Sequence, residues 1–309
     1  MKPFLSLKAL LFSASLVLIS CTSVEHVTSP AVTPRAPVIQ ENLGEQVARH
    51  LTSRYADTRS DCGKPSMPSF LCSGVMLRGT SSNPKYHVWD NSPASISKGG
   101  VSFSYLRADT DFDRLAYGYT NGYIFESYVH AGDKIHPEIL CSYPVDAWTG
   151  HRPEAGCGAY PGLAGSGACH LKGVTTAAQW WEDYDSHPTE RHQWQCGFDV
   201  RNSRNELGGP AFAASVEARA YLGAEGYQVQ NEIMVKTWDD NLGKVLPLEA
   251  FYYIEAAGLP VAQRNQRDLR AADGILIPII SVRLAPTQNG TATFYYIASD
   301  QTEPMPVAP

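Results

Sequence analysis

The sequence predicts an α+β protein, with helices in its first two thirds and strands dominating its end. Three observations support this fold class. Apolar residues recur at helical spacing in three stretches, 41–58, 173–186 and 209–226. Runs rich in β-branched and aromatic residues fill much of the rest, and four of them follow one another after residue 229. Glycine and proline are scattered along the chain, as in a loop-rich globular domain.

The individual elements follow in chain order. Apolar residues at helical spacing from Leu43 to Leu51 define one face of the first helix. The second helix is expected to be capped near Thr175, and the third to stop at Gly223 and Gly226. A short helix is expected early in 112–130. Strands are expected in seven segments: 71–80, 99–109, the end of 112–130, 230–238, 248–256, 274–284 and 292–299.

The first 20 residues predict an export signal. Lysines at positions 2 and 8 precede an apolar run, 9–19, that is too short to span a bilayer comfortably. The run ends in Leu-Ile-Ser-Cys, which resembles a bacterial lipobox and predicts that Cys21 is lipidated. Thr22 follows it, so nothing favours retention in the inner membrane. The alternative is an ordinary leader that is cut a few residues later and discards Cys21.

Four regions follow from this reading. Residues 1–20 are a lipoprotein signal, and 21–41, rich in Pro, Thr, Ser and Val, form a flexible tether. Residues 42–300 form one folded domain, and 301–309 are a tail. The mature protein is therefore expected outside the cytoplasm, as an outer-membrane lipoprotein or a secreted protein, touching the membrane only through a lipid anchor.

The cysteine count predicts disulfides. Without Cys21 an even number remains, no two are spaced as a CxxC pair, and no metal site is expected. Six cysteines allow 15 connectivities, and short loops close most easily. We therefore expect the pairs Cys62–Cys72, Cys157–Cys169 and Cys141–Cys196.

The charge argues against one class of partner. The formal net charge is −6, and it becomes −8 when Lys2 and Lys8 leave with the signal, because 23 basic residues then face 31 acidic ones. Nucleic acid is therefore not expected to bind.

Three short motifs occur in a fixed order. Arg78 lies in a predicted strand, Ser102-Phe103-Ser104 lies in the next, and Gln230-Asn231-Glu232 begins a later one. Side chains two apart on a strand point to the same side, so Gln230 and Glu232 project together. The set resembles the Arg, Ser-Thr-Ser and Glu/Gln-X-Glu signature of mono-ADP-ribosyltransferases of the cholera-toxin type. Phe103 departs from the usual threonine.

Longer segments extend the resemblance over roughly residues 42–300. They are similar to the halovibrin family, exported bacterial proteins associated with NAD cleavage and ADP-ribosyl transfer. The segments are "DCGKPSMPSFLCSGVMLRGT", "YHVWDNSP", "GGVSFSYLRADTDFDRLAYGYTNGYIF", "CGAYPG", "TTAAQWW" and "CGFDVRNS".

That resemblance implies an ADP-ribosyltransferase-like split β-sheet core with flanking helices. NAD would be the substrate, with no further cofactor, and the acceptor would be water or a host or competitor protein. The gap between Ser104 and Gln230 is long for this fold. Residues 133–210, which hold four of the six cysteines, are therefore read as a disulfide-stabilised insertion.

The residue types fit the chemistry that the resemblance implies. Cleavage of the nicotinamide–ribose bond builds positive charge on the ribose, which a carboxylate at Glu232 would stabilise. Gln230 would orient the acceptor, and Ser102 would brace Glu232. Arg78 would hold the NAD phosphates with its planar fork of donors.

Four further residues are assigned to substrate binding. Ser104 would lie behind the catalytic residues, and Tyr227 would stack on nicotinamide or on the acceptor. Gly79 and Thr80 follow Arg78 directly and are assigned to the same site.

A second function class stays open. A Gln-X-Glu triplet is common on solvated strands, and a serine pair is common on the polar face of a strand. The protein would then be a non-catalytic envelope lipoprotein that binds a carbohydrate or a protein through its tyrosines and tryptophans. Trp180 and Trp181 would be candidates for such a surface, although aromatic residues on a helix more often fill a core. Release of nicotinamide from NAD separates the two classes.

Overall fold

Local signals in the sequence explain where the first helix begins. In the computed structural model, α1 spans Leu43–Ala56, and Asn42 caps it. The Asn42 side chain accepts from the Glu45 N–H, and the Glu45 carboxylate accepts from the Asn42 N–H, which forms a capping box. The helix predicted at 41–58 is therefore confirmed.

The structure describes residues 41–90, 95, 100–127, 138–152, 157–163, 165–200, 208–236 and 248–308. These residues belong to one compact unit. The predicted export signal, Cys21 and nearly all of the predicted tether lie outside the described residues. Within the described part of the chain, no helix has the length and apolarity to span a bilayer.

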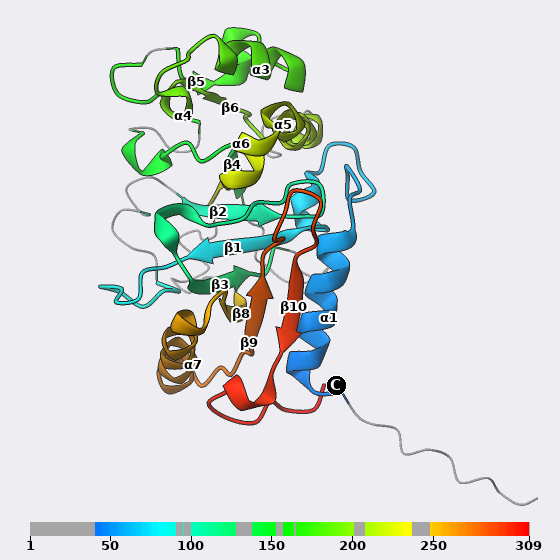
Figure 1. Ribbon diagram of the computed structural model, residues 1–309, viewed down its shortest axis with the longest axis vertical. Coiled ribbons are helices and arrows are strands. Elements are labelled where there is room, and N and C mark those ends of the chain that lie inside the picture. Colours follow the sequence, from blue (N-terminus) through cyan, green and yellow to red (C-terminus); the bar gives the residue numbers. More distant parts are fainter. Residues whose placement is uncertain are drawn as a thin grey trace, which may run out of the picture. The chain divides into compact units, whose positions relative to one another are not determined.

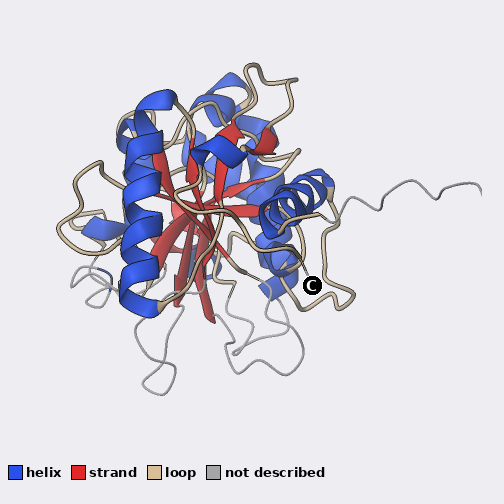
Figure 2. Ribbon diagram, turned by 90° about the horizontal axis from the view of Figure 1, so that it is seen from below, coloured by secondary structure: helices blue, strands red, loops and turns tan. Residues whose placement is uncertain are grey.

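Eight strands form one mixed sheet, in the order β10-β9-β8-β3-β1-β2-β7-β4 (Figure 1). Neighbouring strands are antiparallel except β8 and β9, which are parallel. Figure 2 shows helices on both sides of these strands, so the class is α+β as predicted. The strands are β1 (Val75–Gly79), β2 (Val101–Leu106), β3 (Asn121–Phe125), β4 (Glu138–Tyr143), β7 (Glu232–Lys236), β8 (Leu248–Tyr253), β9 (Ile279–Arg283) and β10 (Thr293–Tyr296).

The longer helices pack on the two faces of this sheet. Leu51 of α1 lies in a buried cluster with Leu77 of β1 on one face. On the other face, a second cluster joins Phe103 of β2 to Phe212 and Leu269. Each such fully buried side chain stabilises the fold by about 1.5 to 3 kcal/mol. In the described part of the chain, the other helices of four or more residues are α3 (Ala177–Asp185), α4 (Arg191–Trp194), α5 (Gly208–Leu222), α6 (Ala224–Gln228) and α7 (Leu259–Asp273).

Two of the larger elements were not predicted. Helix α7 follows β8 and covers the sheet with a face that includes buried Asn265 and Gln266. Strand β4 lies within the segment 133–210 that was expected to be an insertion, and it forms an edge of the main sheet beside β7. The first part of that segment is therefore integral to the sheet. Its later part adds α3, α4 and the short parallel pair β5 (Gly167–Ala168) and β6 (Cys196–Gly197).

The disulfide prediction was correct for one pair and wrong for two. Cys62–Cys72 is confirmed. The other bonds are Cys141–Cys157 and Cys169–Cys196, not Cys157–Cys169 and Cys141–Cys196. The parallel pairing of β5 with β6 brings the chain at Cys169 to Cys196. Doubling a loop costs only about 0.6 kcal/mol of closure entropy, so strand pairing outweighs loop length. Three disulfides are consistent with an extracellular or periplasmic protein.

Two predictions about helix ends and aromatic residues were also tested. Gly223, with φ of 54°, ends α5 as expected. Gly226 does not end a helix, because it lies buried within α6. Trp180 is fully buried in the core, so it is a packing residue and not part of a binding surface.

Candidate active site

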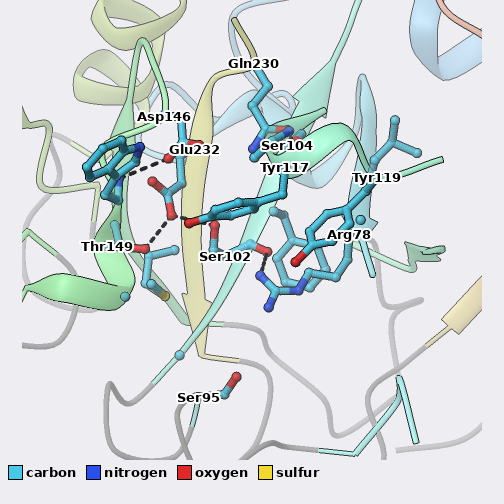
Figure 3. Close-up of a pocket in the computed structure, with 18 of the residues that line it drawn as sticks. Arg78, Ser95, Ser102, Ser104, Tyr117, Tyr119, Asp146, Thr149, Gln230 and Glu232 are labelled. Atoms are coloured by element: carbon cyan, nitrogen blue, oxygen red, sulfur yellow. Dashed lines mark hydrogen bonds between the residues drawn. The ribbon is translucent and has the colours of Figure 1, made fainter. Parts of the chain in front are cut away.

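A pocket opens where strand β2 changes partner. The first half of β2, residues 101–103, pairs with β7, whereas its second half, 104–106, pairs with β1. Because β1 and β7 flank different halves of β2, the sheet splits at this junction. The resulting pocket has a volume of about 210 Å³. Its lining includes Arg78, Gly79, Ser102, Ser104, Tyr117, Tyr119, Asp146, Thr149, Gln230 and Glu232 (Figure 3).

Glu232 lies at the start of β7 and is held by three donors. Ser102 Oγ donates to its Oε1 at 2.5 Å, Thr149 Oγ1 donates to the same oxygen, and the Ala147 N–H donates to Oε2 at 2.8 Å. An ionised carboxylate only accepts hydrogen bonds, so this set of donors suits it. Only 3% of Glu232 is exposed, which differs from the solvated strand face that a lone Gln-X-Glu triplet suggests. The predicted contact with Ser102 is present.

Gln230 lines the same pocket, but its amide oxygen is already engaged. That oxygen accepts from Ser104 Oγ at 2.7 Å and from the Ala116 N–H at 3.0 Å. Ser104 therefore contacts the triplet from behind, as expected. Through Ala116, Gln230 also anchors the short 3-10 turn Ala116–Gly118 that carries Tyr117.

Arg78 lies at the point where β1 leaves β2. The last pair between these strands is Leu77 with Ser104, and Arg78 Nη1 donates to the Ser102 carbonyl oxygen at 2.6 Å. Gly79 lines the pocket beside it. Thr80 lies in an adjoining hollow instead, where its hydroxyl accepts from Asn121 Nδ2 at 3.0 Å.

Tyr227 does not join these residues. The loop expected around it is instead the short helix α6, and the Tyr227 hydroxyl donates to the Ala285 carbonyl oxygen. Tyr227 is absent from the described lining of the pocket, so the expected stacking on substrate does not fit this geometry. The structure thus brings together Arg78, Gly79, Ser102, Ser104, Gln230 and Glu232, and leaves Thr80 and Tyr227 outside.

Sequence reasoning missed two groups of pocket residues. Asp146, Trp148 and Thr149 follow β4, whose ladder with β7 carries the chain alongside the triplet. Tyr117 is 78% exposed, has a left-handed φ of 57°, and lies beside Tyr119 with ring centroids 5.6 Å apart. No motif in the sequence marks either group, because the place of these residues in the pocket depends on strand pairing between distant segments.

Asp146 adds a second carboxyl group next to Glu232 (Figure 3). Its backbone N–H donates to the Gln230 carbonyl oxygen at 2.9 Å, and its Oδ1 accepts from the Trp148 N–H at 3.0 Å. Burial, together with the neighbouring Glu232 and a hydrogen bond to it, raises the pKa of Asp146 to about 8. The Asp146 carboxyl group therefore keeps its proton to a higher pH than an ordinary aspartate does.

Asn231, in the middle of the triplet, holds β2 and β7 together from the opposite side. Its Oδ1 accepts from the Tyr105 N–H at 2.7 Å, and its Nδ2 donates to the Tyr105 carbonyl oxygen at 2.8 Å. The amide thus replaces a backbone pair just beyond the last pair of β2 with β7, Phe103 with Ile233. Asn231 is 4% exposed, so these hydrogen bonds are shielded from water.

Replacing Asn231 with leucine should therefore destabilise the protein by about 2 to 6 kcal/mol, because the Tyr105 N–H and carbonyl lose their partners. Chemical denaturation measures this loss. Asn42→Leu is a matched control, since that amide caps a helix at the surface and its loss costs about 1 kcal/mol. Equal effects of the two changes would contradict the role given to Asn231.

A scan of the chain against models of known protein families found no match, and a search of curated proteins found none either.

Proposed function

We propose that this protein cleaves the nicotinamide–ribose bond of NAD and passes the ADP-ribose to water or to a protein acceptor. The observation that carries the proposal is the buried Glu232 carboxylate, which three donors hold at the wall of an open pocket. The resemblance of the Arg, Ser-X-Ser and Gln-X-Glu motifs to ADP-ribosyltransferases supports it, because residues far apart in sequence meet in this one pocket. NAD is the substrate, and no further cofactor is required.

The chemistry places a defined demand on the site. When the bond breaks, its electron pair leaves with the nicotinamide nitrogen, and positive charge builds on the ribose. A carboxylate fixed in advance beside the ribose stabilises that charge without having to reorient. The hydrogen bonds from Ser102 and Thr149 fix Glu232 in this way.

The shape around Arg78 suits a dinucleotide. A second hollow of about 210 Å³ adjoins the pocket, and both include Arg78, Gly79 and Tyr119 in their linings. The second hollow also includes Lys85 and His87. In the proposed pose, nicotinamide and its ribose occupy the Glu232 side, the pyrophosphate lies against Arg78, and the adenosine half enters the second hollow.

The direct test incubates the purified mature protein with NAD and follows nicotinamide release. Adding labelled agmatine, a small guanidinium compound, distinguishes hydrolysis from transfer to arginine. We expect nicotinamide and free ADP-ribose, with little ADP-ribosyl agmatine. Absence of nicotinamide release, with water or with a panel of acceptor proteins, would favour the non-catalytic envelope lipoprotein instead.

Replacing Arg78 with lysine should raise KM for NAD about tenfold and change kcat less. Lysine keeps the positive charge but loses the bidentate fork that matches a phosphate. A group that binds ground state and transition state alike affects KM more than kcat. Steady-state kinetics with Arg114→Lys as the control measures the difference, because Arg114 is exposed and lies outside both hollows. An unchanged KM would make Arg78 a structural residue.

A further inference from the structure

Asp146 has the position of a group that acts on the acceptor. It follows β4, and its N–H donates to the Gln230 carbonyl oxygen, so it lies at the head of β7 beside the Glu232 carboxyl. Its side chain is half-buried and lines the pocket. Among the residues that the structure describes, its one side-chain hydrogen-bond partner is Glu232. Gln230, by contrast, has its amide oxygen committed to Ser104 and Ala116.

We infer that Asp146 is the catalytic base that removes a proton from the acceptor, and that the acceptor is water or another neutral hydroxyl. This inference rests on the proposed NAD cleavage. The two carboxyl groups then divide the work: Glu232 stabilises the positive ribose, and Asp146 serves the incoming nucleophile. The acceptor is neutral because a carboxylate cannot readily remove a proton from a guanidinium, whose pKa is above 12.

The step balances in atoms and electrons. The C1′–N bond breaks, and its electron pair leaves with nicotinamide. A lone pair of the acceptor oxygen forms the new C1′–O bond, and the acceptor proton passes to the Asp146 carboxylate. The products are nicotinamide, ADP-ribose or its adduct, and a protonated Asp146, which returns its proton to solvent. No oxidant, reductant or metal takes part in this balance.

The groups around Asp146 set the direction of its pH dependence. Glu232 faces it from β7, Tyr117 from the 3-10 turn, and the His192 ring bonds its backbone from α4. His151 lines the same pocket. Because burial and the neighbouring Glu232 raise the pKa of Asp146, its basic form becomes more abundant as the pH rises above neutral. Capture by water should therefore improve as pH rises through 8.

Two reactions of the same enzyme isolate this step. Exchange of labelled nicotinamide into NAD breaks and remakes the C1′–N bond and moves no acceptor proton. Hydrolysis to ADP-ribose requires that proton to leave. The ratio of hydrolysis to exchange therefore reports on acceptor capture alone, whatever the rate of bond cleavage.

In the wild-type protein, we expect this ratio to rise as pH increases from 6 to 9. In Asp146→Asn, we expect it to fall on the order of 10²-fold and to lose its pH dependence. Azide needs no deprotonation, so it should still trap ADP-ribose in the variant. Asp113→Asn is the control, because Asp113 is exposed and outside the pocket lining, and its ratio should stay at the wild-type value.

A ratio that is independent of pH in the wild-type protein, or unchanged in Asp146→Asn, would overturn the inference. The wild-type measurement can refute the inference even if the variant does not fold. A wild-type protein that neither hydrolyses NAD nor exchanges nicotinamide would refute the proposed function instead, so the two failures are distinguishable.

Discussion

Replacing Glu232 with glutamine should lower NAD cleavage on the order of 10³-fold, because it removes the charge that stabilises the ribose cation in the transition state. Glutamine has nearly the same shape and keeps one acceptor oxygen for Ser102 and Thr149. Its amide NH2 would meet either these hydroxyls or the Ala147 N–H, since both carboxylate oxygens now accept hydrogen bonds. One lost hydrogen bond costs about 1 to 3 kcal/mol of stability.

Kinetics and folding must therefore be measured on the same samples. Nicotinamide release gives kcat, and far-UV circular dichroism at the assay temperature shows that the variant is folded. Glu249→Gln is the control, because Glu249 is a strand glutamate too, half-buried on β8 and outside the pocket. Turnover of folded Glu232→Gln within a few-fold of wild type would falsify the catalytic role.

Removing the Cys141–Cys157 disulfide should abolish most of the activity and also lower the stability of the fold. This bond joins two cysteines that are 16 residues apart, and the loop between them contains Asp146, Ala147 and Thr149. Replacing both cysteines with alanine should cost about 3 kcal/mol by the chain-entropy relation. Since Ala147 and Thr149 donate to Glu232, loosening this loop also releases the carboxylate from two of its three donors.

The Cys62–Cys72 pair is a close control for this change. Its separation is 10 residues, so replacing both cysteines should cost nearly as much stability, about 2.7 kcal/mol. Neither residue lines the pocket. We expect both double variants to show lower melting temperatures, but only Cys141→Ala/Cys157→Ala to lose kcat at a temperature where both remain folded. Equal losses of kcat would show that the disulfides act through global stability alone.

The predictable part of the fold is the part with local signals. Helix α1 has its capping box and a regular apolar face, and the predicted strands are rich in aromatic and β-branched residues. Helix α7 was missed because several residues on its buried face are polar: Asn265 and Gln266 lie between Ala262 and Leu269. Gln266 is accommodated in the core by hydrogen bonds to Ile277 and Thr302, which no periodicity of apolar residues indicates.

The site divides in the same way. Arg78, Ser102, Gln230 and Glu232 follow motifs in the chain, and the structure brings them together. Asp146 and Thr149 belong to no such motif, because their place beside Glu232 comes from the ladder of β4 with β7. The disulfide errors have the same origin, since pairing of short strands decides which cysteines meet. The features that could not be predicted from the sequence are therefore those that depend on contacts between distant segments.

The two ends of the folded domain are joined to each other. The Leu43 N–H donates to the Pro306 carbonyl oxygen at 2.9 Å, and the Ala308 N–H donates to the Glu41 carbonyl oxygen at 3.0 Å. Figure 1 shows the C-terminus beside the start of α1, which also packs on β10. The first helix therefore lacks its contacts with β10 and with residues 306–308 until that part of the chain has been synthesised. A chain that emerges from the ribosome N-terminus first cannot complete this fold before residue 308 has emerged, so closure of the domain is a late step of folding.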